Sequence, residues 1–401
     1  MRLRYKAVSE DGKRVRGFVE AKEIKDAAVY LRQRNLIPIQ ISKETEFFLL
    51  KKVPGIGRVR SKDVILFTRQ LSSMLTSGLT LVKSLEILKD QATNKVLQEI
   101  IGGILLDLQE GKSFSDSISK YPDIFSPVYI SLVKAGESSG LLDKVFLRLA
   151  SNLEKQRRLR NTVKGALIYP VIVITLMVVV IIILMVFVVP QLNELYESLN
   201  IKLPFVTRVV VGISSTVAKI WPLIVGLGGV FLYAFLRWKR TLKGKEIYDN
   251  NILKLPLFGK IITLTILTEF SRTFGLLVGT GTLIVDALNQ GSEVTGNYVY
   301  ESAIKDVSKR VEKGVPVGEA MTYHPLFPPL LVQLVKSGEE TGKMDENLLK
   351  ASEYFEEEVN QSVKTLTTAM EPFIMIVLGI GVGFLVFSVI TPIYSLLSAV
   401  Q

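Results

Sequence analysis

The chain of 401 residues contains no cysteine and a single histidine, His324. The absence of cysteine excludes disulfide bonds, thiolate nucleophiles and metal sites that need sulfur ligands. One histidine excludes metal sites built from several histidines and leaves little basis for a Ser-His-Asp triad. His324 stands before Pro325 in an expected turn, where a catalytic role is not expected. The sequence therefore predicts no catalytic residue, no metal ligand and no cofactor site.

Charged side chains are absent from two long stretches. Val171–Val189 has Thr175 as its only polar member, and at about 1.5 Å per residue it spans roughly 29 Å, the thickness of a hydrocarbon core. No charged residue follows Pro372 to the end of the chain. A weaker apolar segment, Ile220–Leu236, contains Pro222 and three glycines. With a mean hydropathy of +0.34, the chain is predicted to be a polytopic membrane protein with three transmembrane helices.

One pattern of residues occurs twice, at 67–190 and at 270–392, and such repeats decide architecture. The offset is 203 residues at first and 202 after a one-residue deletion, as shown by Phe67/Phe270, Arg69/Arg272, Gly78/Gly281, Gly111/Gly314, Pro122/Pro325, Phe125/Phe327, Lys134/Lys336, Asp143/Asp345, Pro170/Pro372 and Pro190/Pro392. Each half is a polar segment of about six predicted helices that runs into an apolar span. The predicted fold is therefore predominantly α, with two homologous six-helix bundles.

The formal net charge of +11 is unevenly placed, with basic residues gathered before the first span and after the second. By the positive-inside rule, residues 1–165 and 240–370 are predicted to be cytoplasmic, whereas the 190–215 loop and the C-terminus are external. The N-terminal residues lack the apolar core of a signal peptide. The basic excess is read as membrane topology, and no nucleic-acid partner is expected.

The first residues predict a small separate α+β module. Arg2–Val8 and Val15–Ala21 alternate as strands around a turn signal, Ile24–Arg34 has helical spacing, and Leu36–Ile41 alternates again. The order is strand, strand, helix, strand. A linker follows, in which Phe47–Leu50 is read either as a contact with a partner or the bilayer, or as a short buried helix.

The complete predicted division of the chain follows from these signals. It consists of the module at 1–42, the linker at 43–62, the first cytoplasmic helical domain at 63–165, the first transmembrane helix at 166–190, an external loop at 191–215, the second transmembrane helix at 216–238, the second cytoplasmic helical domain at 239–369 and the third transmembrane helix at 370–397.

A Gly-Glu-x-x-Gly turn occurs in each half. A phosphate-binding loop would need a preceding strand and a Lys-Ser/Thr pair, so nucleotide binding is not expected here. Two readings remain: a capped helix–helix turn with a carboxylate near backbone N–H groups, and an exposed docking surface. The candidate interaction residues are Gly136, Glu137, Gly140, Gly338, Glu339 and Gly342.

The helices that lead into the first and third spans differ in charge. Arg157 and Arg158 precede the first span, whereas Glu357 and Glu358 precede the third. Either both faces are solvated, or the two helices lie side by side with complementary charge. In the second case, reversal of the arginines should impair assembly, and reversal of the glutamates should rescue it.

Three further residues at the third span are candidates. Glu371 precedes Pro372 at the membrane edge, where it is either hydrated or part of a functional site. Gly379 and Gly383 have a small-x-x-x-small spacing that permits close helix packing in lipid, against another span or another copy of the chain.

The chain resembles the polytopic inner-membrane platform protein of type IV pilus and type II secretion machines. The resemblance covers nearly the whole sequence and rests on Phe67-Thr-Arg-Gln-Leu, both Gly-Glu-x-x-Gly turns, Tyr169-Pro170, Met370-Glu371-Pro372 and the duplicated domains. Thr295-Gly296-Asn297 and Gly338-Glu339-Glu340-Thr341-Gly342 look closer to the pilus branch.

The resemblance implies a scaffold without catalysis in a bacterial inner membrane. Its implied partners are a cytoplasmic hexameric ATPase for assembly or retraction, pilin or pseudopilin subunits, other inner-membrane assembly proteins, and further copies in a homodimer or higher homo-oligomer. ATP-driven motion would pass through the platform to the filament.

Three other functions are compatible with parts of this sequence. One is the equivalent platform of a type II secretion system. A transporter would also explain duplicated halves, but three spans without paired charges make a poor conduit. A membrane enzyme is disfavoured because the chain has one histidine and no convincing carboxylate pair.

Overall fold

The computed structural model of the chain describes residues 2–9, 14–20, 30, 36–43, 59–183, 187, 191, 212, 226–256 and 258–400. The N-terminal strands are β1 (Arg2–Ser9), β2 (Arg14–Glu20) and β3 (Leu36–Lys43). They form an antiparallel sheet in the order β2-β1-β3, with Leu3 opposite Val19 on one side and Lys43 on the other. The three predicted strands are confirmed, whereas the predicted helix at 24–34 lies outside the described residues except for Tyr30, which is helical.

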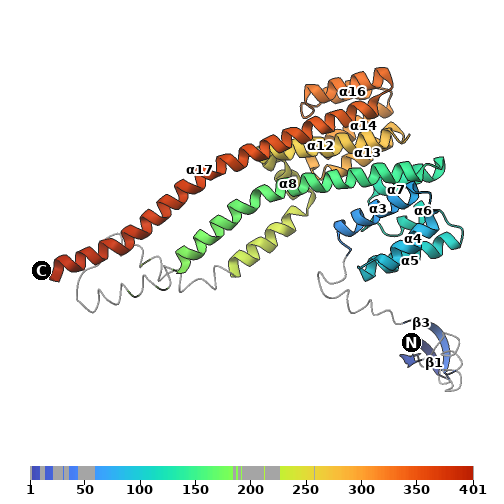
Figure 1. The fold of residues 1–401 in the computed structure, drawn as a ribbon, viewed down its shortest axis with the longest axis horizontal. Coiled ribbons are helices and arrows are strands. Elements are labelled where there is room, and N and C mark those ends of the chain that lie inside the picture. Colours follow the sequence, from blue (N-terminus) through green and yellow to red (C-terminus); the bar gives the residue numbers. More distant parts are fainter. Residues whose placement is uncertain are drawn as a thin grey trace.

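The first bundle is built from helices whose ends follow the cap signals of the sequence. Thr80, Asn94, Ser113 and Ser126 accept hydrogen bonds from backbone N–H groups of the helices they precede. The helices are α3 (Ser61–Thr76), α4 (Leu81–Gln91), α5 (Lys95–Gln109), α6 (Phe114–Ser119), α7 (Pro127–Ser139) and α8 (Leu142–Ile183). Figure 1 shows them as one compact group at the start of the long helix α8.

The second bundle repeats the first almost residue for residue. Lys95 and Gln109, the ends of α5, correspond to Tyr298 and Glu312, the ends of α14, at an offset of 203. Pro127 and Pro329 start α7 and α16 at an offset of 202. After α11 (Leu242–Leu253), the helices are α12 (Phe258–Val278), α13 (Ile284–Val294), α14 (Tyr298–Glu312), α15 (Val317–Thr322), α16 (Pro329–Thr341) and α17 (Met344–Val400). The predicted pair of six-helix bundles is confirmed.

Aromatic side chains fill the centre of each bundle. In the first, Phe125 stacks at a tilt on Tyr129 and Phe67, and the Tyr129 hydroxyl shares a hydrogen bond of 3.1 Å with Thr68. Burial raises the pKa of Tyr129 well above its ordinary value. In the second, Phe270 stacks on Phe274 with ring centroids 5.6 Å apart. These cores fix how the surrounding helices present their outer faces.

Two long helices leave the bundles side by side in the same direction, as Figure 1 shows. α8 continues without interruption through Pro170, and α17 through Pro372. The uninterrupted passage from bundle into apolar span that the sequence indicates is therefore present. Their apolar parts also pack together, where Met177 of α8 faces Phe373 and Val377 of α17.

Three helices of the described residues, α8, α12 and α17, are long and apolar enough to cross a membrane. α12 differs from the other two because 72% of its most apolar window is buried inside the protein. It packs along α17 and forms the core of the second bundle. Burial by protein therefore accounts for its apolar sequence without contact with lipid.

The predicted span at 216–238 is described only from residue 226, and its earlier part lies outside the described residues. Residues 226–239 are helical. Phe231, Val230 and Tyr233 are among its most exposed side chains. Such a run of exposed apolar residues is typical of a helix that faces lipid.

Candidate functional site

The carboxylate of each Gly-Glu-x-x-Gly turn lies inside its own bundle and caps a short helix. Glu137 accepts hydrogen bonds from the backbone N–H of Phe114 at 2.6 Å and of Ser115 at 3.0 Å, and from the Ser115 hydroxyl at 2.7 Å. Glu339 accepts the equivalent bonds from Val317 and Gly318 at 2.8 and 3.1 Å. Each carboxylate accepts hydrogen bonds from the free N–H groups at the N-terminus of α6 or α15, and its negative charge interacts favourably with the helix dipole there.

The two glycines of each turn have different roles. Gly140 and Gly342 end α7 and α16 in the left-handed conformation, at φ of 70° and 71°, which glycine adopts without strain. Gly136 and Gly338 instead lie where the next helix passes closely. A Cβ on Gly136 would be 2.8 Å from a methyl of Val145, and one on Gly338 would be 2.7 Å from the Cα of Met344.

The structure therefore contains the carboxylate-to-N–H hydrogen bonds that the capped-turn interpretation requires. The N–H groups belong, however, to a helix more than twenty residues earlier in the chain. The exposed part of the second turn is Glu340, Thr341 and Gly342. A docking role for these turns stays a prediction, and the exposed positions are the ones that could carry it.

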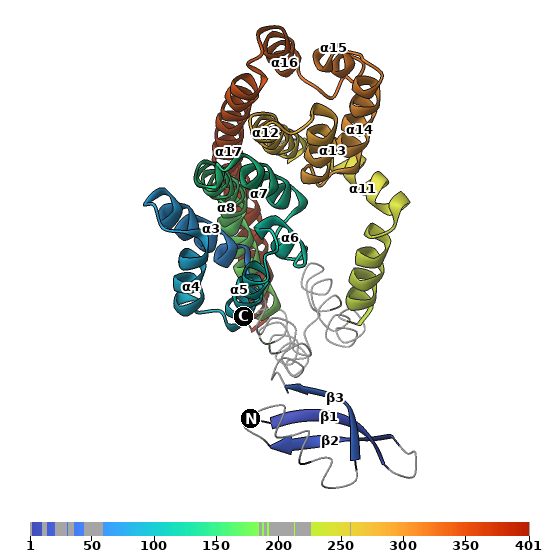
Figure 2. The same ribbon diagram turned by 90° about the vertical axis from the view of Figure 1, so that its right-hand side faces the viewer.

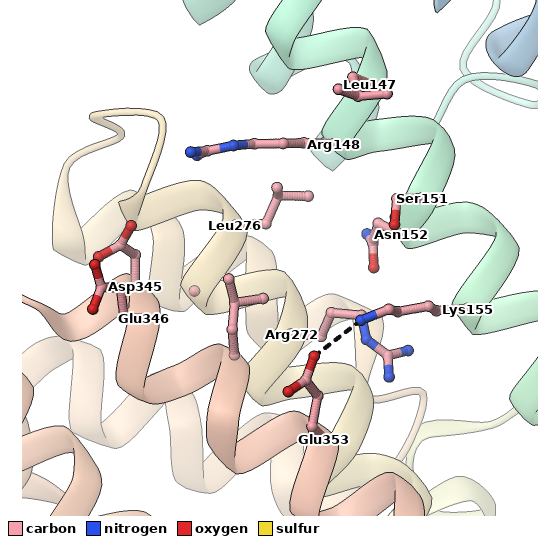
Figure 3. Close-up of a pocket in the computed structure, with 12 residues that line it drawn as sticks. Leu147, Arg148, Ser151, Asn152, Lys155, Arg272, Leu276, Asp345, Glu346 and Glu353 are labelled. Carbon is pink, nitrogen blue, oxygen red and sulfur yellow. Dashed lines mark hydrogen bonds and ion pairs between the residues drawn. The ribbon is translucent and has the colours of Figure 1, made fainter.

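The bundles meet along α8 and α17. Lys155 of α8 pairs with Glu353 of α17 at 3.2 Å, and Arg148 donates to the backbone carbonyl of Gly279 at 3.2 Å. Figure 3 shows Lys155 and Glu353 reaching toward each other across a pocket of about 440 Å³ between the two bundles. The predicted side-by-side arrangement of these helices is therefore present.

A carboxylate of α12 completes this contact. Glu269 accepts a hydrogen bond from Gln156 at 3.0 Å and lies 3.5 Å from Arg160. α8 consequently occupies a groove formed by α12 and α17, with its cations directed at glutamates of the second bundle. Glu269 carries no local sequence signal, and the repeat does not mark it either, because its counterpart in the first half is Leu66.

Each bundle also contains an Arg–Glu ion pair at equivalent positions. Arg69 of α3 pairs with Glu154 of α8, and Arg272 of α12 pairs with Glu356 of α17. Only 4% of the Arg272 side chain is exposed, against 63% for Arg69. Nε and Nη1 of Arg272 have no hydrogen-bond partner among the described residues. The recurrence of arginine at this offset was the available sequence signal for the pair.

The arginines and glutamates named from the sequence lie on other surfaces than this contact. Arg157 and Arg158 line a groove of about 660 Å³ between α3 and α8, together with Lys62, Leu66 and Arg69. Glu358 lies 3.8 Å from Lys260 of its own bundle, and Glu357 is exposed. The charges that pair across α8 and α17 are Lys155 and Glu353, about one helical turn away from the predicted ones.

The candidates at the third span lie on the continuous helix α17. Glu371 is exposed where the apolar part begins. Gly381, between the two glycines singled out, faces Met177 of α8 at 3.8 Å from its sulfur, measured from an ideal Cβ. Gly379 and Gly383 have open space among the described residues. Their packing partner stays a prediction, and in this fold it lies away from α8.

His324 is part of a local polar cluster. Its Nε2 lies 2.9 Å from Asp306, which also accepts a hydrogen bond from Arg310 at 2.7 Å. Arg310 first, and then His324, hold the pKa of the Asp306 carboxyl below its ordinary value of 3.8. Within the described residues, no group of three or more His, Asp or Glu side chains could hold a metal ion. The described residues therefore support binding of partners through charged surfaces better than they support catalysis or metal binding.

Comparison with known protein families gives two matches. Residues 67–190 and 270–392 each match the family described as "Type II secretion system (T2SS), protein F". Residues 4–42 match the family described as "Type II secretion system protein F, N-terminal domain". The limits of the first match coincide with those of the repeat expected from the sequence.

Several curated proteins are similar over nearly their whole length. The chain is 36% identical to "Type IV pilus assembly protein PilC" of Thermus thermophilus, over 99% of this chain and 98% of the relative. It is 33% identical to "Type IV pilus assembly protein TapC" of Aeromonas hydrophila, over 98% and 95%. It is 29% identical to "Type II secretion system protein F" of Xanthomonas campestris, over 99% of both chains.

Proposed function

The chain belongs to the type II secretion system protein F family, and from this premise we propose that it is the inner-membrane platform protein of a type IV pilus machine. In this role it couples a cytoplasmic hexameric ATPase to the extraction of pilin from the membrane and to filament assembly or retraction. The exposed apolar parts of α8 and α17, the exposed apolar helix at residues 226–239 and the family all fit a bacterial inner-membrane protein.

The sequence identities favour a type IV pilus over a type II secretion system. The relatives that are named for type IV pilus assembly reach 36% and 33% identity over nearly the whole chain. Those named for type II secretion reach 29% and 27% over comparable lengths. Full-length coverage means that the bundles and the spans are all shared.

The proposed orientation puts both bundles and the N-terminal module in the cytoplasm and the C-terminus outside. Its support is the cluster of basic residues in α8 just before the apolar part, namely Lys155, Arg157, Arg158, Arg160 and Lys164. The bundles are then available to an ATPase, whereas the apolar parts of α8 and α17 are available to pilin.

The long helices offer a physical route for the coupling. α8 and α17 are continuous from bundle to span, so a force that tilts a bundle moves its span as one body. The chain acts as a scaffold in this proposal, and the chemical energy comes from the ATPase. A transporter function is disfavoured, because the described parts of the spans contain no facing pair of charges that could bind a transported ion.

Deletion of the gene tests the proposal. We expect surface filaments to be absent by electron microscopy while pilin stays in the membrane fraction, with recovery by the wild-type gene and not by an empty vector. Secretion of folded exoproteins should be unchanged. Normal filaments in the deletion strain would contradict the proposal. Lost secretion with normal filaments would assign the chain to the type II secretion system instead.

Binding of the ATPase can be tested separately at the exposed turn. Glu340→Arg changes an exposed charge and leaves the hydrogen bonds of Glu339 to Val317 and Gly318 intact. We expect it to reduce co-purification of the full-length chain with the ATPase, whereas Lys95→Glu at the exposed start of α5 should not. Equal co-purification of both variants would remove the turn from the docking surface.

A further inference from the structure

The contact between the bundles shows what kind of element fits one face of this fold. α8 of the first bundle lies in the groove between α12 and α17, held by Lys155 to Glu353 and by Gln156 to Glu269. Figure 2 shows α8 and α7 of the first bundle next to α12 and α13 of the second. A helix that runs parallel to α17 is therefore the natural occupant of this groove.

The first bundle has a related groove between α3 and α8, which no described element covers. It contains the counterparts of Glu269, Arg272 and Glu356, whereas Ser151, the counterpart of Glu353, faces the second bundle. The equivalent arginines differ in exposure accordingly: the Arg69 side chain in the open groove is 63% exposed, and the Arg272 side chain in the covered groove is 4% exposed. The open groove measures about 660 Å³. Leu66 lies on it, at the position that Glu269 occupies in the covered groove, and is 52% exposed.

The charge of the open groove is opposite to that of the covered one. The covered groove presents Glu269 and Glu353 to the cations of α8. The open groove is lined by Lys62, Arg69, Arg157 and Arg158, and its single carboxylate, Glu154, is already paired with Arg69. An occupant must therefore present an acidic helix face.

The chain itself contains a helix face with this charge. At the positions of α17 that correspond to Lys155 and Gln156 of α8 stand Glu357 and Glu358, and Asn152 corresponds to Tyr354. Tyr354 is 50% exposed and Glu357 is exposed, whereas Glu358 is half-exposed and lies 3.8 Å from Lys260 of its own bundle. In the internal contact the groove is acidic and the helix α8 is basic. The open groove is basic and this face of α17 is acidic, so the two surfaces are again complementary in charge.

We propose that a second molecule of this chain places the outer face of its α17, defined by Tyr354, Glu357 and Glu358, into the open groove between α3 and α8. The contact joins different surfaces of the two molecules, so each molecule keeps one free groove and one free α17 face until a ring closes. This proposal goes beyond the proposed function and does not depend on it.

The membrane is compatible with this arrangement. α8 and α17 run in the same direction into their apolar parts, so a second α17 docked parallel to α8 also enters the bilayer from the correct side. The two molecules are then related by rotation about the bilayer normal. The complementary charges of Arg157 and Arg158 with Glu357 and Glu358 act between molecules in this geometry.

Cysteine cross-linking tests the contact in whole membranes, and the chain has no native cysteine to interfere. Two differently tagged full-length chains are co-expressed, one with Leu66→Cys and the other with Glu358→Cys, the equivalents of Glu269 and Gln156. We expect a disulfide-linked product that contains both tags. The pair Glu269→Cys and Gln156→Cys within one chain is the positive control, because these side chains are in contact.

Two results of this experiment would overturn the proposal. One is the absence of the mixed product while the internal control cross-links. The other is an equally strong product from Leu66→Cys alone, which would mean that two grooves face each other about a twofold axis. Both substitutions are at exposed or half-exposed positions, so the folded chain is retained.

Charge reversal gives an independent readout through co-purification of two tagged chains in detergent. Arg157→Glu with Arg158→Glu in both chains should lower co-purification at least tenfold, and adding Glu357→Arg with Glu358→Arg should restore it. Lys95→Glu with Lys144→Glu removes the same amount of positive charge, at helix starts where a carboxylate is favourable, and should have no effect.

Other occupants of the groove would show themselves in the same variants. Loss of binding to anionic phospholipid vesicles, or to the ATPase, with unchanged co-purification of the two chains would assign the groove to that partner and overturn the proposal. Failure of the fourfold variant to restore co-purification would do the same.

Discussion

The same ion pair occurs in both bundles, yet it is exposed in one and buried in the other. Arg69 and Glu154 have 63% and 34% of their side chains exposed, whereas Arg272 and Glu356 have 4% and 19%. The cause is the neighbour, because α8 of the first bundle covers the second pair and no described element covers the first. Equivalent residues therefore face different environments in one molecule.

A second set of equivalent positions differs in its chemistry. Asp107 and Lys120 form an ion pair in the first bundle, and their counterparts Arg310 and Tyr323 form a cation–π contact at 4.4 Å in the second. The backbone ends of α5 and α14 nevertheless coincide at one offset. Different side-chain interactions thus hold the same two elements together, which shows that helix geometry constrains the repeat more tightly than contact chemistry does.

Removal of the arginine from each pair should show the largest difference in stability between the two bundles. Arg272→Ala leaves Glu356 as an uncompensated, largely buried charge and is expected to cost about 3 to 5 kcal/mol of local stability. Arg69→Ala removes an exposed pair and is expected to cost at most about 1 kcal/mol. Hydrogen exchange of α12 and α17, compared with α3 in the full-length chain in detergent, measures both. Equal losses would mean that coverage by α8 does not distinguish the pairs.

The first glycines of the two turns give the next largest difference. Gly338→Ala forces a Cβ against the backbone of α17, since the nearest atom is the Met344 Cα at 2.7 Å, whereas Gly136→Ala meets a side-chain methyl at 2.8 Å. Because a side chain can yield more easily, we expect about 3 kcal/mol for Gly338→Ala and about 1 kcal/mol for Gly136→Ala, within the range for overpacking. Thermal unfolding of each variant measures this, and a larger loss for Gly136→Ala would contradict it.

The half-buried carboxylates Glu137 and Glu339 should show a smaller contrast. Glu137 accepts three hydrogen bonds and Glu339 accepts two. We expect Glu137→Gln to destabilise its bundle by about 2 kcal/mol and Glu339→Gln by about 1 kcal/mol, since bonds to a charged group are worth more than neutral ones. Exchange of the first amides of α6 and α15 reports on each cap. Unchanged exchange in both variants would show that neither charge is needed.

Local rules made the helices predictable from the sequence. Ser126 before Pro127 and Ser113 are start signals for α7 and α6, because caps act within a few residues. The Gly136–Gly140 segment, interpreted from the sequence as a turn, is instead the last turn of α7, which ends at Ser139 with Gly140 in the left-handed conformation. The repeat then transferred each boundary to the second bundle. The outcome for the strands of the N-terminal module is similar, because alternation and a turn signal are also local.

The contacts between bundles were not predictable in the same way. Glu137 bonds to residues more than twenty positions earlier, and Glu269 meets Gln156 across two bundles. No periodicity specifies which face of α8 meets α17, since either helix could be rotated or shifted by one turn with similar burial. Complementary charge on the two helices was therefore foreseeable, whereas the pairing of Lys155 with Glu353 was not.

Acid should act directly on Asp107, whereas at the counterpart position Arg310 does not titrate and only its partner Asp306 can be protonated. Hydrogen bonds from Lys112 first, and then from Lys120, hold the pKa of Asp107 below its ordinary value of 3.8. A carboxyl with a lowered folded-state pKa contributes its full stability above the ordinary pKa and loses it as the pH falls through the folded-state value. We therefore expect α5 and α6 to loosen below about pH 3.8, as measured by their amide exchange corrected for intrinsic rates. Asp107→Asn should remove this part of the pH dependence, and an unaltered pH profile in the variant would contradict the expectation.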